Sequence, residues 1–444
     1  MQKFIKTMNR LKLLYLVCLI GVSGIFKAGA QPDSVYRFTL EQAQEYAINH
    51  FFVSQNAKLD IEIARKKIWE TTALGLPQVS GTFNYQHVPN PPTLPFQDAD
   101  GNPVDITVAL ENSATYGATV SQLVFSGEYI VGLQASRTYR TFAEENYEKV
   151  RIDLKETLAG TYYTVLILEQ NREIVSQTVE NLKLNLNHVE RFFEQGLVED
   201  TDVDQLNLVL KRTENSLLTI ERQIENVRKL LKIQLGIPAN TQVILLEPLD
   251  ALITKNLVTP TNYTFNLEEH IDYRLLQTNE DLMDLSMKRE KSTFLPSVSA
   301  FYQYSDKTDK PDFDFSIKHV MGVNVNIPIF SSGMRMAKVS QAKIELDKTR
   351  NLKEQQSQML ILGAQQALSE YNSAFENYSN EKMNFELSQK VFDNTTLKFK
   401  QGMVSALDLS TVNNQLLQAQ LSYAAAVQDL LTKKVALDKA YSKL

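Results

Sequence analysis

Few residues in this chain have the types and spacings that catalysis or metal binding requires. The sequence holds a single cysteine, Cys18. Its five histidines are widely separated and are His50, His87, His188, His270 and His319. No two of them have the His-x-x-x-His spacing that places zinc ligands on one helix face. The sequence also lacks a glycine-rich phosphate loop and a GxSxG nucleophile motif. We therefore predict that the protein is not an enzyme and needs no cofactor or metal.

The charges of the chain are dispersed and slightly acidic in sum. Lys and Arg number 46, and Asp and Glu number 52, which gives a formal net charge of −6. An acidic chain without basic clusters binds nucleic acid poorly, so no nucleic-acid partner is expected. Most acids lie along predicted helices, where a solvated surface explains them. Asp408 ends a Ser405-Ala-Leu-Asp408 segment that resembles a capping box at a helix N-terminus.

Residues 1–30 have the three parts of a signal peptide. A basic region from Lys3 to Lys12 precedes an apolar run from Leu13 to Ile20, and Ala28-Gly29-Ala30 predicts cleavage before Gln31. A membrane anchor is the alternative, but the apolar run is shorter than the about 20 residues that a spanning helix needs. Loss of five basic residues would move the net charge from −6 to −11 and remove the only cysteine, so no disulfide is expected.

The rest of the sequence contains an internal repeat. Arg191–Val198 resembles Lys398–Val404, and Leu76–Val79 resembles Leu295–Val298. These and further matches occur in the same order in both halves, which predicts a first structural repeat over residues 31–235 and a second over 265–444. The joining residues 236–264 contain three prolines that would interrupt a helix.

Apolar residues recur with heptad spacing over most of each repeat. After Gly196, for example, they fall at Val203, Leu206 and Leu210. This periodicity predicts four helices that bury their seams as antiparallel coiled coils, over residues 129–195, 201–235, 334–401 and 405–440. Each longer helix would extend about 100 Å at 1.5 Å per residue, which exceeds the diameter of one compact domain.

Four other segments alternate between apolar and polar residues with the period of a β-strand. They are residues 79–88, 113–125, 297–305 and 313–330. One apolar and one polar face per strand are typical of an outer-membrane barrel. In the last strand, the residues expected to face lipid are Phe315, Ile317, Val323 and Val325. A soluble sheet packed on a core is the alternative, although the long helices offer no obvious layer to cover it.

Four strands are too few to form a closed barrel, because about eight is the smallest workable number. An open sheet in lipid would leave unpaired backbone groups along its edges. Several chains must therefore share one barrel. Two chains would give eight strands and a filled interior, whereas three give twelve strands and room for water, which the polar inner faces favour.

Two halves, each built as helix, two strands, long helix, hairpin and helix, resemble the TolC family of outer-membrane efflux and secretion channels. The resemblance covers nearly the whole chain after residue 30. It implies a mainly α fold with a small β part, in a homotrimer with one 12-stranded transmembrane barrel in outer-membrane lipid. It also implies a helical tunnel in the periplasm, where residues 236–264 form an equatorial segment. A periplasmic adaptor and an inner-membrane transporter would supply substrate and energy.

The resemblance also assigns roles to the turns between the long helices. In the family, a Gly-Leu pair at each tip meets the adaptor. Gly196-Leu197 fits this pattern and Gly402-Met403 departs from it conservatively. The implied docking residues are Gly196, Leu197, Val198, Gly402, Met403 and Val404. Glycine at the end of a helix equally serves as a C-cap with positive φ.

Family channels narrow their periplasmic entrance with inward acids just after the second hairpin. Asp408 matches the first of these acids, whereas Thr411 stands where a second would be and Val404 where a basic residue can hold the closed state. Asp202 occupies the equivalent place in the first half, beside Glu199. Part of the ionic gate of the family is therefore missing from this sequence.

Two functions from different classes account for the sequence. The first is a passive outer-membrane channel for small-molecule efflux or type I protein secretion, and the chain does not reveal whether its substrate is a drug, a metal ion, another small molecule or a protein. The second is a trimeric structural or adhesive coiled coil with a short barrel anchor. An adhesin should place its bulk outside the cell, whereas the loops between the paired strands here are small. The channel is the favoured interpretation.

Overall fold

The computed structural model describes residues 35–97, 100–101, 103–107, 110–257, 263–310, 314 and 316–444. The predicted signal peptide and Phe315 lie outside these residues. The first half of the chain contains β1 (Tyr36–Phe38), α2 (Leu40–His50), α3 (Phe52–Ala73), β2 (Gln78–His87), β3 (Thr93–Gln97), β4 (Pro103–Thr107), β5 (Asn112–Phe125), α4 (Gly127–Glu194) and α5 (Asp200–Leu235). The second contains β6 (Val243–Leu245), α6 (Leu249–Asn256), the 3₁₀ turn η1 (Leu267–Glu269), α7 (Ile271–Ser292), β7 (Ser297–Lys307), β8 (His319–Asn326), α8 (Met334–Lys400) and α9 (Ala406–Ala440).

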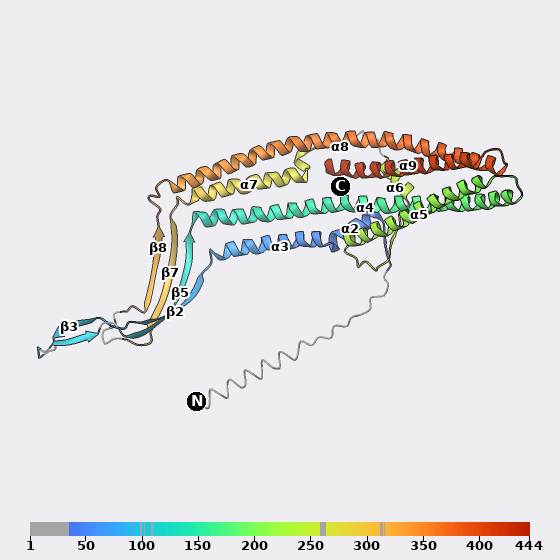
Figure 1. The fold of residues 1–444 in the computed structure, drawn as a ribbon. Helices are drawn as coiled ribbons and strands as arrows, with labels where there is room; N and C mark the ends of the chain where they lie inside the picture. The colour runs from blue at the N-terminus through green and yellow to red at the C-terminus, as the bar shows by residue number, and fades with distance from the viewer. Residues whose placement is uncertain are drawn as a thin grey trace, which may run out of the picture.

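The described chain is elongated, with a four-stranded sheet at one end and two helical hairpins at the other (Figure 1). Helix α4 has 68 residues and α8 has 67, and both run from the sheet to the far end, a length of about 100 Å. There the chain turns, and α5 and α9 return beside them. Shorter helices α3 and α7 continue the helical layer toward the sheet. The prediction of a mainly helical protein with a small β part is confirmed.

The long helices are stable because their heptad seams are buried between neighbours. On α8 an aromatic residue recurs every seven positions, and Tyr371, Tyr378 and Phe392 of this line are buried. Phe385, in the same line, stacks on Tyr423 of α9 at a centroid distance of 5.3 Å. At its start, α4 is capped by Ser126, whose hydroxyl accepts a hydrogen bond from the Tyr129 N–H.

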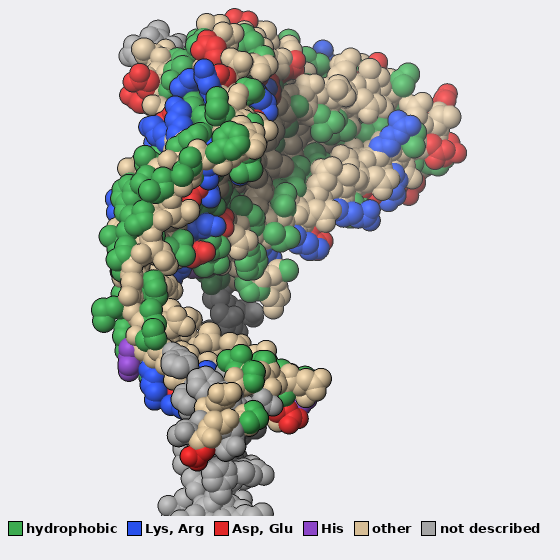
Figure 2. All heavy atoms as spheres, turned by 90° about the vertical axis from the view of Figure 1, so that its left-hand side faces the viewer, with side chains coloured by type: hydrophobic (Ala, Val, Ile, Leu, Met, Phe, Trp, Pro, Cys, Tyr) green, Lys and Arg blue, Asp and Glu red, His purple; other side chains and the backbone are tan. Residues whose placement is uncertain are grey.

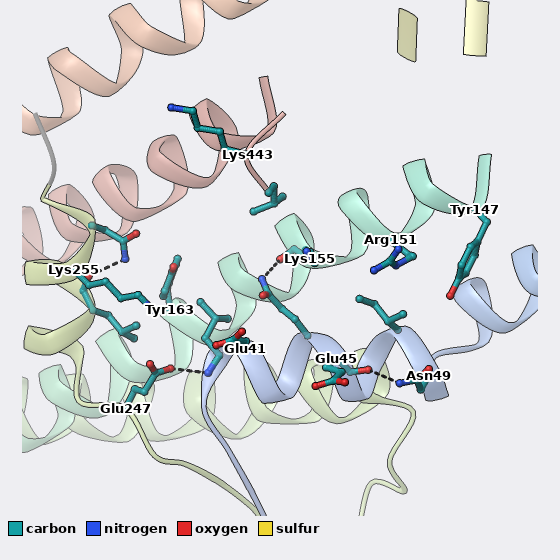
Figure 3. A pocket seen from close by; sticks show the side chains of 16 residues that line it. Glu41, Glu45, Asn49, Tyr147, Arg151, Lys155, Tyr163, Glu247, Lys255 and Lys443 are labelled. Atoms are coloured by element: carbon teal, nitrogen blue, oxygen red, sulfur yellow. Dashed lines mark hydrogen bonds between the residues drawn. The ribbon is translucent and has the colours of Figure 1, made fainter. Parts of the chain in front are cut away.

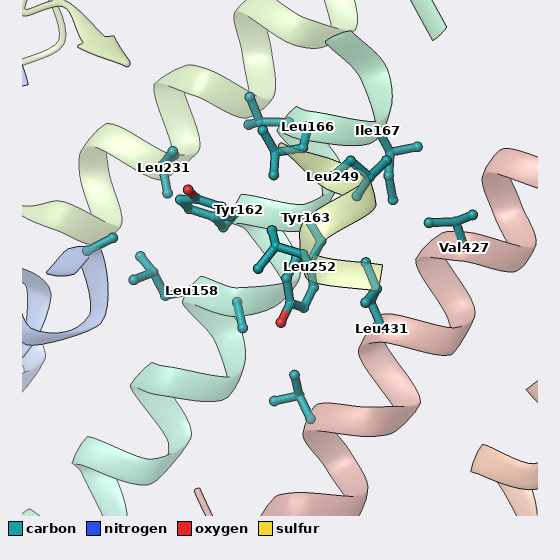
Figure 4. Close-up of a cluster of buried hydrophobic side chains, with 14 of the residues drawn as sticks. Leu158, Tyr162, Tyr163, Leu166, Ile167, Leu231, Leu249, Leu252, Val427 and Leu431 are labelled. Atoms are coloured by element: carbon teal, nitrogen blue, oxygen red, sulfur yellow. The ribbon is translucent and has the colours of Figure 1, made fainter. Parts of the chain in front are cut away.

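The largest core lies halfway along the helices, where α2 and α6 pack against α4 and α9. Figure 4 shows its centre, in which Tyr162 of α4 lies toward Leu231 of α5, and Tyr163 of α4 lies beside Leu252 of α6 on the side of Leu431 of α9. The Tyr162 hydroxyl donates to the carbonyl of Phe38, next to the short parallel pair β1–β6. This core joins segments of both halves, so β6 and α6, from the segment predicted as equatorial, help to hold the two hairpins together at mid-length.

The sheet is antiparallel, with strand order β2-β5-β7-β8. Its register aligns the apolar residues of neighbouring strands. Val79 of β2 pairs with Val120 of β5, which pairs with Tyr302 of β7, and Tyr302 pairs with Met321 of β8. One row further, Ala300 pairs with Val323. Because side chains alternate along a strand, these residues form one apolar face.

The opposite face of the sheet is polar. Thr82 pairs with Gly117, which pairs with Ser305, and Ser299 pairs with Asn324. On the apolar face, Val323 is 63% exposed and Val325 is 55% exposed within this chain. Viewed from the sheet end, hydrophobic side chains gather along one side of the molecule and the middle is hollowed (Figure 2).

The strand predicted over residues 313–330 is shorter in the structure, where β8 spans His319–Asn326. Before it, the Asp314 carboxylate accepts hydrogen bonds from the N–H and hydroxyl of Ser316, and local hydrogen bonds of this kind compete with strand pairing. At its other end, Asn326 pairs with Ser297, the first residue of β7. Ile317 was therefore wrongly placed in the strand, although its side chain is 72% exposed.

The hairpin β3–β4 between β2 and β5 has no counterpart among our sequence predictions. It extends the sheet end of the molecule away from the helices (Figure 1). Among the described residues, none of the helices is long and apolar enough to cross a membrane.

Candidate functional site at the hairpin tips

Both hairpins turn by the same backbone motif. In the first turn, the N–H of Leu197 bonds to the carbonyl of Phe192 at 2.9 Å, and the N–H of Gly196 to Phe193 at 2.8 Å. In the second, Met403 bonds to Lys398 at 2.9 Å. Gly196 and Gly402 have φ of 73° and 70°. These are Schellman motifs, in which glycine takes the left-handed conformation without steric cost. The predicted C-cap role of both glycines is therefore confirmed.

The residue after each glycine projects from the molecule. Leu197 is 67% exposed and Met403 is 69% exposed, and both lie at the very end of their hairpins. Nearby, Phe193 and Leu407 are also exposed, at 44% and 59%. Sequence analysis missed these two, although their positions just outside the heptad seam are the signal that could have found them. The tips thus present four large apolar side chains to solvent.

A cavity of about 340 Å³ separates the two tips. Its wall includes Leu197, Val198 and Asp202 of the first hairpin, and Gly402 and Val404 of the second. The structure thus brings together residues that are about 200 positions apart in the sequence. Gly196, Met403, Asp408 and Thr411, the other predicted site residues at this end, do not line the cavity.

Asp408 forms the capping box that its sequence suggested. Its carboxylate accepts from the Ser405 N–H at 3.0 Å and from the Ser405 hydroxyl at 2.7 Å, and its own N–H donates to that hydroxyl at 3.2 Å. These hydrogen bonds, first the one from the Ser405 side chain, hold the pKa of Asp408 below its ordinary value. The carboxylate therefore stays charged at neutral pH, and its contribution to stability is lost only as the pH falls through that lowered pKa.

Asp202 occupies the same position in the first hairpin. Its carboxylate accepts from the Glu199 N–H at 3.4 Å, and Glu199 completes a second capping box. Sequence analysis did not identify Glu199 as a cap, because glutamate is not among the residues favoured at that position. Thr411, one turn beyond Asp408, donates to the carbonyl of Leu407 at 2.9 Å. Both acids thus serve their own helix ends and remain able to attract cations.

A second hollow lies beside the central core and has a volume of about 690 Å³ (Figure 3). Glu41 and Glu45 of α2 lie on one side of it, and Arg151 and Lys155 of α4 on the other. These side chains are at the surface, and the mixed charges are typical of a solvated groove. Within the described ranges, no cluster of three or more His, Cys, Asp or Glu side chains could hold a metal ion.

A family model described as outer membrane efflux protein matches residues 55–236 and 276–442. No protein in the curated set matches the chain. Several solved structures resemble this chain over about nine-tenths of its length. CusC, described in terms of folding and transmembrane channel formation, has a TM-score of 0.74 at 17% identity, covering 91% of this chain and 92% of its own.

Two further outer membrane channels have the same fold. CmeC of Campylobacter jejuni has a TM-score of 0.71 at 17% identity and covers 91% of this chain and 85% of its own. MtrE of Neisseria gonorrhoeae, in its open state, has a TM-score of 0.68 at 16% identity. The match covers 90% of this chain and 88% of MtrE.

Proposed function

Because this chain belongs to the outer membrane efflux protein family, we propose that it is the outer-membrane channel of a tripartite efflux pump or a type I secretion system. The resemblance to the TolC family is thereby confirmed, and the protein resides in the outer membrane. In the proposal, its helices extend into the periplasm, and substrate passes through the channel without chemical change. An inner-membrane transporter supplies the energy, and a periplasmic adaptor joins the two.

The observation that carries this proposal is the register of the sheet. It gathers an apolar face across all four strands and leaves the outer edges of β2 and β8 without a strand partner in the described chain. Such edges cannot face lipid, because their backbone groups would remain unsatisfied. Pairing β2 of one copy with β8 of the next removes both edges, and three copies give twelve strands around a water-filled lumen lined by the polar face.

The helices support the same assembly. Near the sheet, four helices lie side by side in the order α3-α4-α7-α8. Helices α3 and α8 therefore form the two edges of this layer. Both carry exposed apolar residues, such as Ile63 and Trp69 on α3 and Ile344 and Met359 on α8. Helix α3 leads into β2, and α8 follows β8. The two apolar sides therefore meet in the trimer that pairs those strands, which buries surface that one copy leaves in water.

The test uses the full chain purified from outer membranes in a mild detergent. We expect the mass of a trimer, and discrete conductance steps when that trimer is inserted into planar bilayers. A monomer would refute the shared barrel, and a dimer would refute the count of twelve strands. A trimer without conductance would favour the structural or adhesive alternative.

A second expected result concerns the entrance. In the proposed trimer, three copies of Asp408 surround the axis near the tips, with Asp202 behind them, and the ring attracts cations. Asp408→Asn removes the charge and keeps an oxygen that can accept the capping hydrogen bond. Reversal-potential measurements should show a loss of cation selectivity and weaker block by multivalent cations. Unchanged selectivity would leave Asp408 as a helix cap alone, and an effect of Asp202→Asn alone would assign the gate to the first hairpin.

A further inference from the structure

Two asparagines are buried near the tips without hydrogen-bond partners. Asn185 of α4 is 1% exposed and Asn413 of α9 is 0% exposed. The nitrogen and the oxygen of each side-chain amide lack a partner within the protein. Most buried polar groups in proteins are hydrogen-bonded, so two fully unpaired amides in one region call for an explanation.

Each amide interrupts an otherwise apolar stripe. Asn185 lies between the buried Leu182 and Val189 on one face of α4. On α9, Asn413 lies in the same way between Leu409 and Leu416. The four leucine and valine residues belong to one core, to which α5 and α8 also contribute. The two amides therefore lie in the core that both hairpins share.

Two buried threonines in the helices of this region are hydrogen-bonded, whereas the side-chain oxygens of Gln205 and Thr396 also lack a partner. Thr213 of α5, which is 0% exposed, donates to the carbonyl of Val209 at 2.9 Å, and Thr178 of α4 donates to Ile174 at 3.0 Å. A threonine hydroxyl reaches the preceding turn of its own helix, which explains how it tolerates burial. Asn185 makes no such bond, so burial costs it the interactions that water would provide.

The two hairpins are joined unevenly along their length. At the central core, Lys439 of α9 donates to Glu156 of α4 at 2.7 Å, and apolar packing is extensive. Toward the tips, the polar link among described residues is one long hydrogen bond, from Gln420 to the carbonyl of Asn171 at 3.5 Å. The hairpins are thus anchored at mid-length, whereas their tip ends are held by an apolar core that contains two unpaired amides.

We propose that Asn185 and Asn413 set the balance between packed and separated hairpins, and hence how readily the periplasmic entrance opens. In the packed state the amides have lost water and gained no partner. When the α8–α9 hairpin moves away from α4–α5, water reaches both amides and satisfies them. The amides thereby weaken the packed state selectively. This inference rests on the proposed channel function, since it assigns the hairpin separation to the entrance.

The test replaces each asparagine by leucine, which has the same branched shape without polar atoms. Purified full-length Asn185→Leu, Asn413→Leu and the double variant are compared with the unmodified trimer. Single-channel recordings should show an open probability lower by about tenfold or more for each substitution. Hydrogen exchange of the backbone amides over residues 175–190 and 405–420 should slow by a similar factor, because both report the same separation.

Thr213→Val is the matched control, because it removes a buried hydroxyl that is already bonded, and it should not slow exchange. Faster or unchanged exchange in the leucine variants, or failure of both to assemble, would overturn the inference, since it would show that the amides are satisfied when packed. If the unmodified trimer does not conduct, the proposed function fails, and hydrogen exchange still decides the role of the amides.

Discussion

Val323→Arg is expected to abolish or strongly reduce trimer assembly, whereas Asn324→Arg in the next position should be tolerated. Val323 lies on the apolar face of β8, beside Ala300 of β7. If that face contacts lipid, arginine near the middle of the bilayer costs about 2–4 kcal/mol per chain. In the proposed trimer three chains share the barrel, so the cost would recur three times in one assembly. Asn324 lies on the polar face, where water would solvate the new charge.

The two variants form a matched pair, because they place the same side chain one residue apart in the same strand. The measurement is the yield of heat-modifiable trimer from outer membranes at equal expression. Equal losses would mean that neither face borders a wide aqueous lumen, and the reverse order would mean that the polar face meets lipid. Val325→Arg should reproduce Val323→Arg more weakly, since charge costs less toward the edge of the bilayer.

Leu197→Asp and Met403→Asp are expected to reduce adaptor recovery at least tenfold without harming the trimer. Both side chains are exposed at the hairpin ends and touch little of their own chain, so folding should not depend on them. If an adaptor covers them, each aspartate would be buried against an apolar partner. Burial of an unpaired polar group costs about 1–3 kcal/mol, and a charge costs more, which lowers affinity tenfold or more.

The assay expresses tagged variants in the native host and quantifies the periplasmic adaptor that copurifies with the trimer. The control is Leu218→Asp, which changes a side chain that is 48% exposed on α5, well away from the tips. An equal loss with this control would indicate a general defect. Undiminished adaptor with both tip variants would place the docking surface elsewhere on the molecule. Conductance of the purified tip variants should match that of the unmodified trimer.

Local sequence patterns were sufficient to predict most of the helices and strands. The heptad seams predicted helices whose ends agree with the structure within about two residues, because a seam that is buried along its whole length stays in register with the sequence. Glycine at positive φ and the Ser405–Asp408 box are likewise local, since capping involves residues a few positions apart. The alternation in the strands indicated which residues share a face before any pairing was known.

Other features depended on contacts between distant residues, and no local pattern could reveal them. The end of β8 at Asn326 follows from where β7 begins, and the short pair β1–β6 joins residues about 200 positions apart. The tip cavity exists because the equatorial core sets the two hairpins side by side. Asn185 and Asn413 read in the sequence as ordinary polar residues on long helices. Only the packing of four helices around them removed their water without providing a partner, and this made them candidates for control of the entrance.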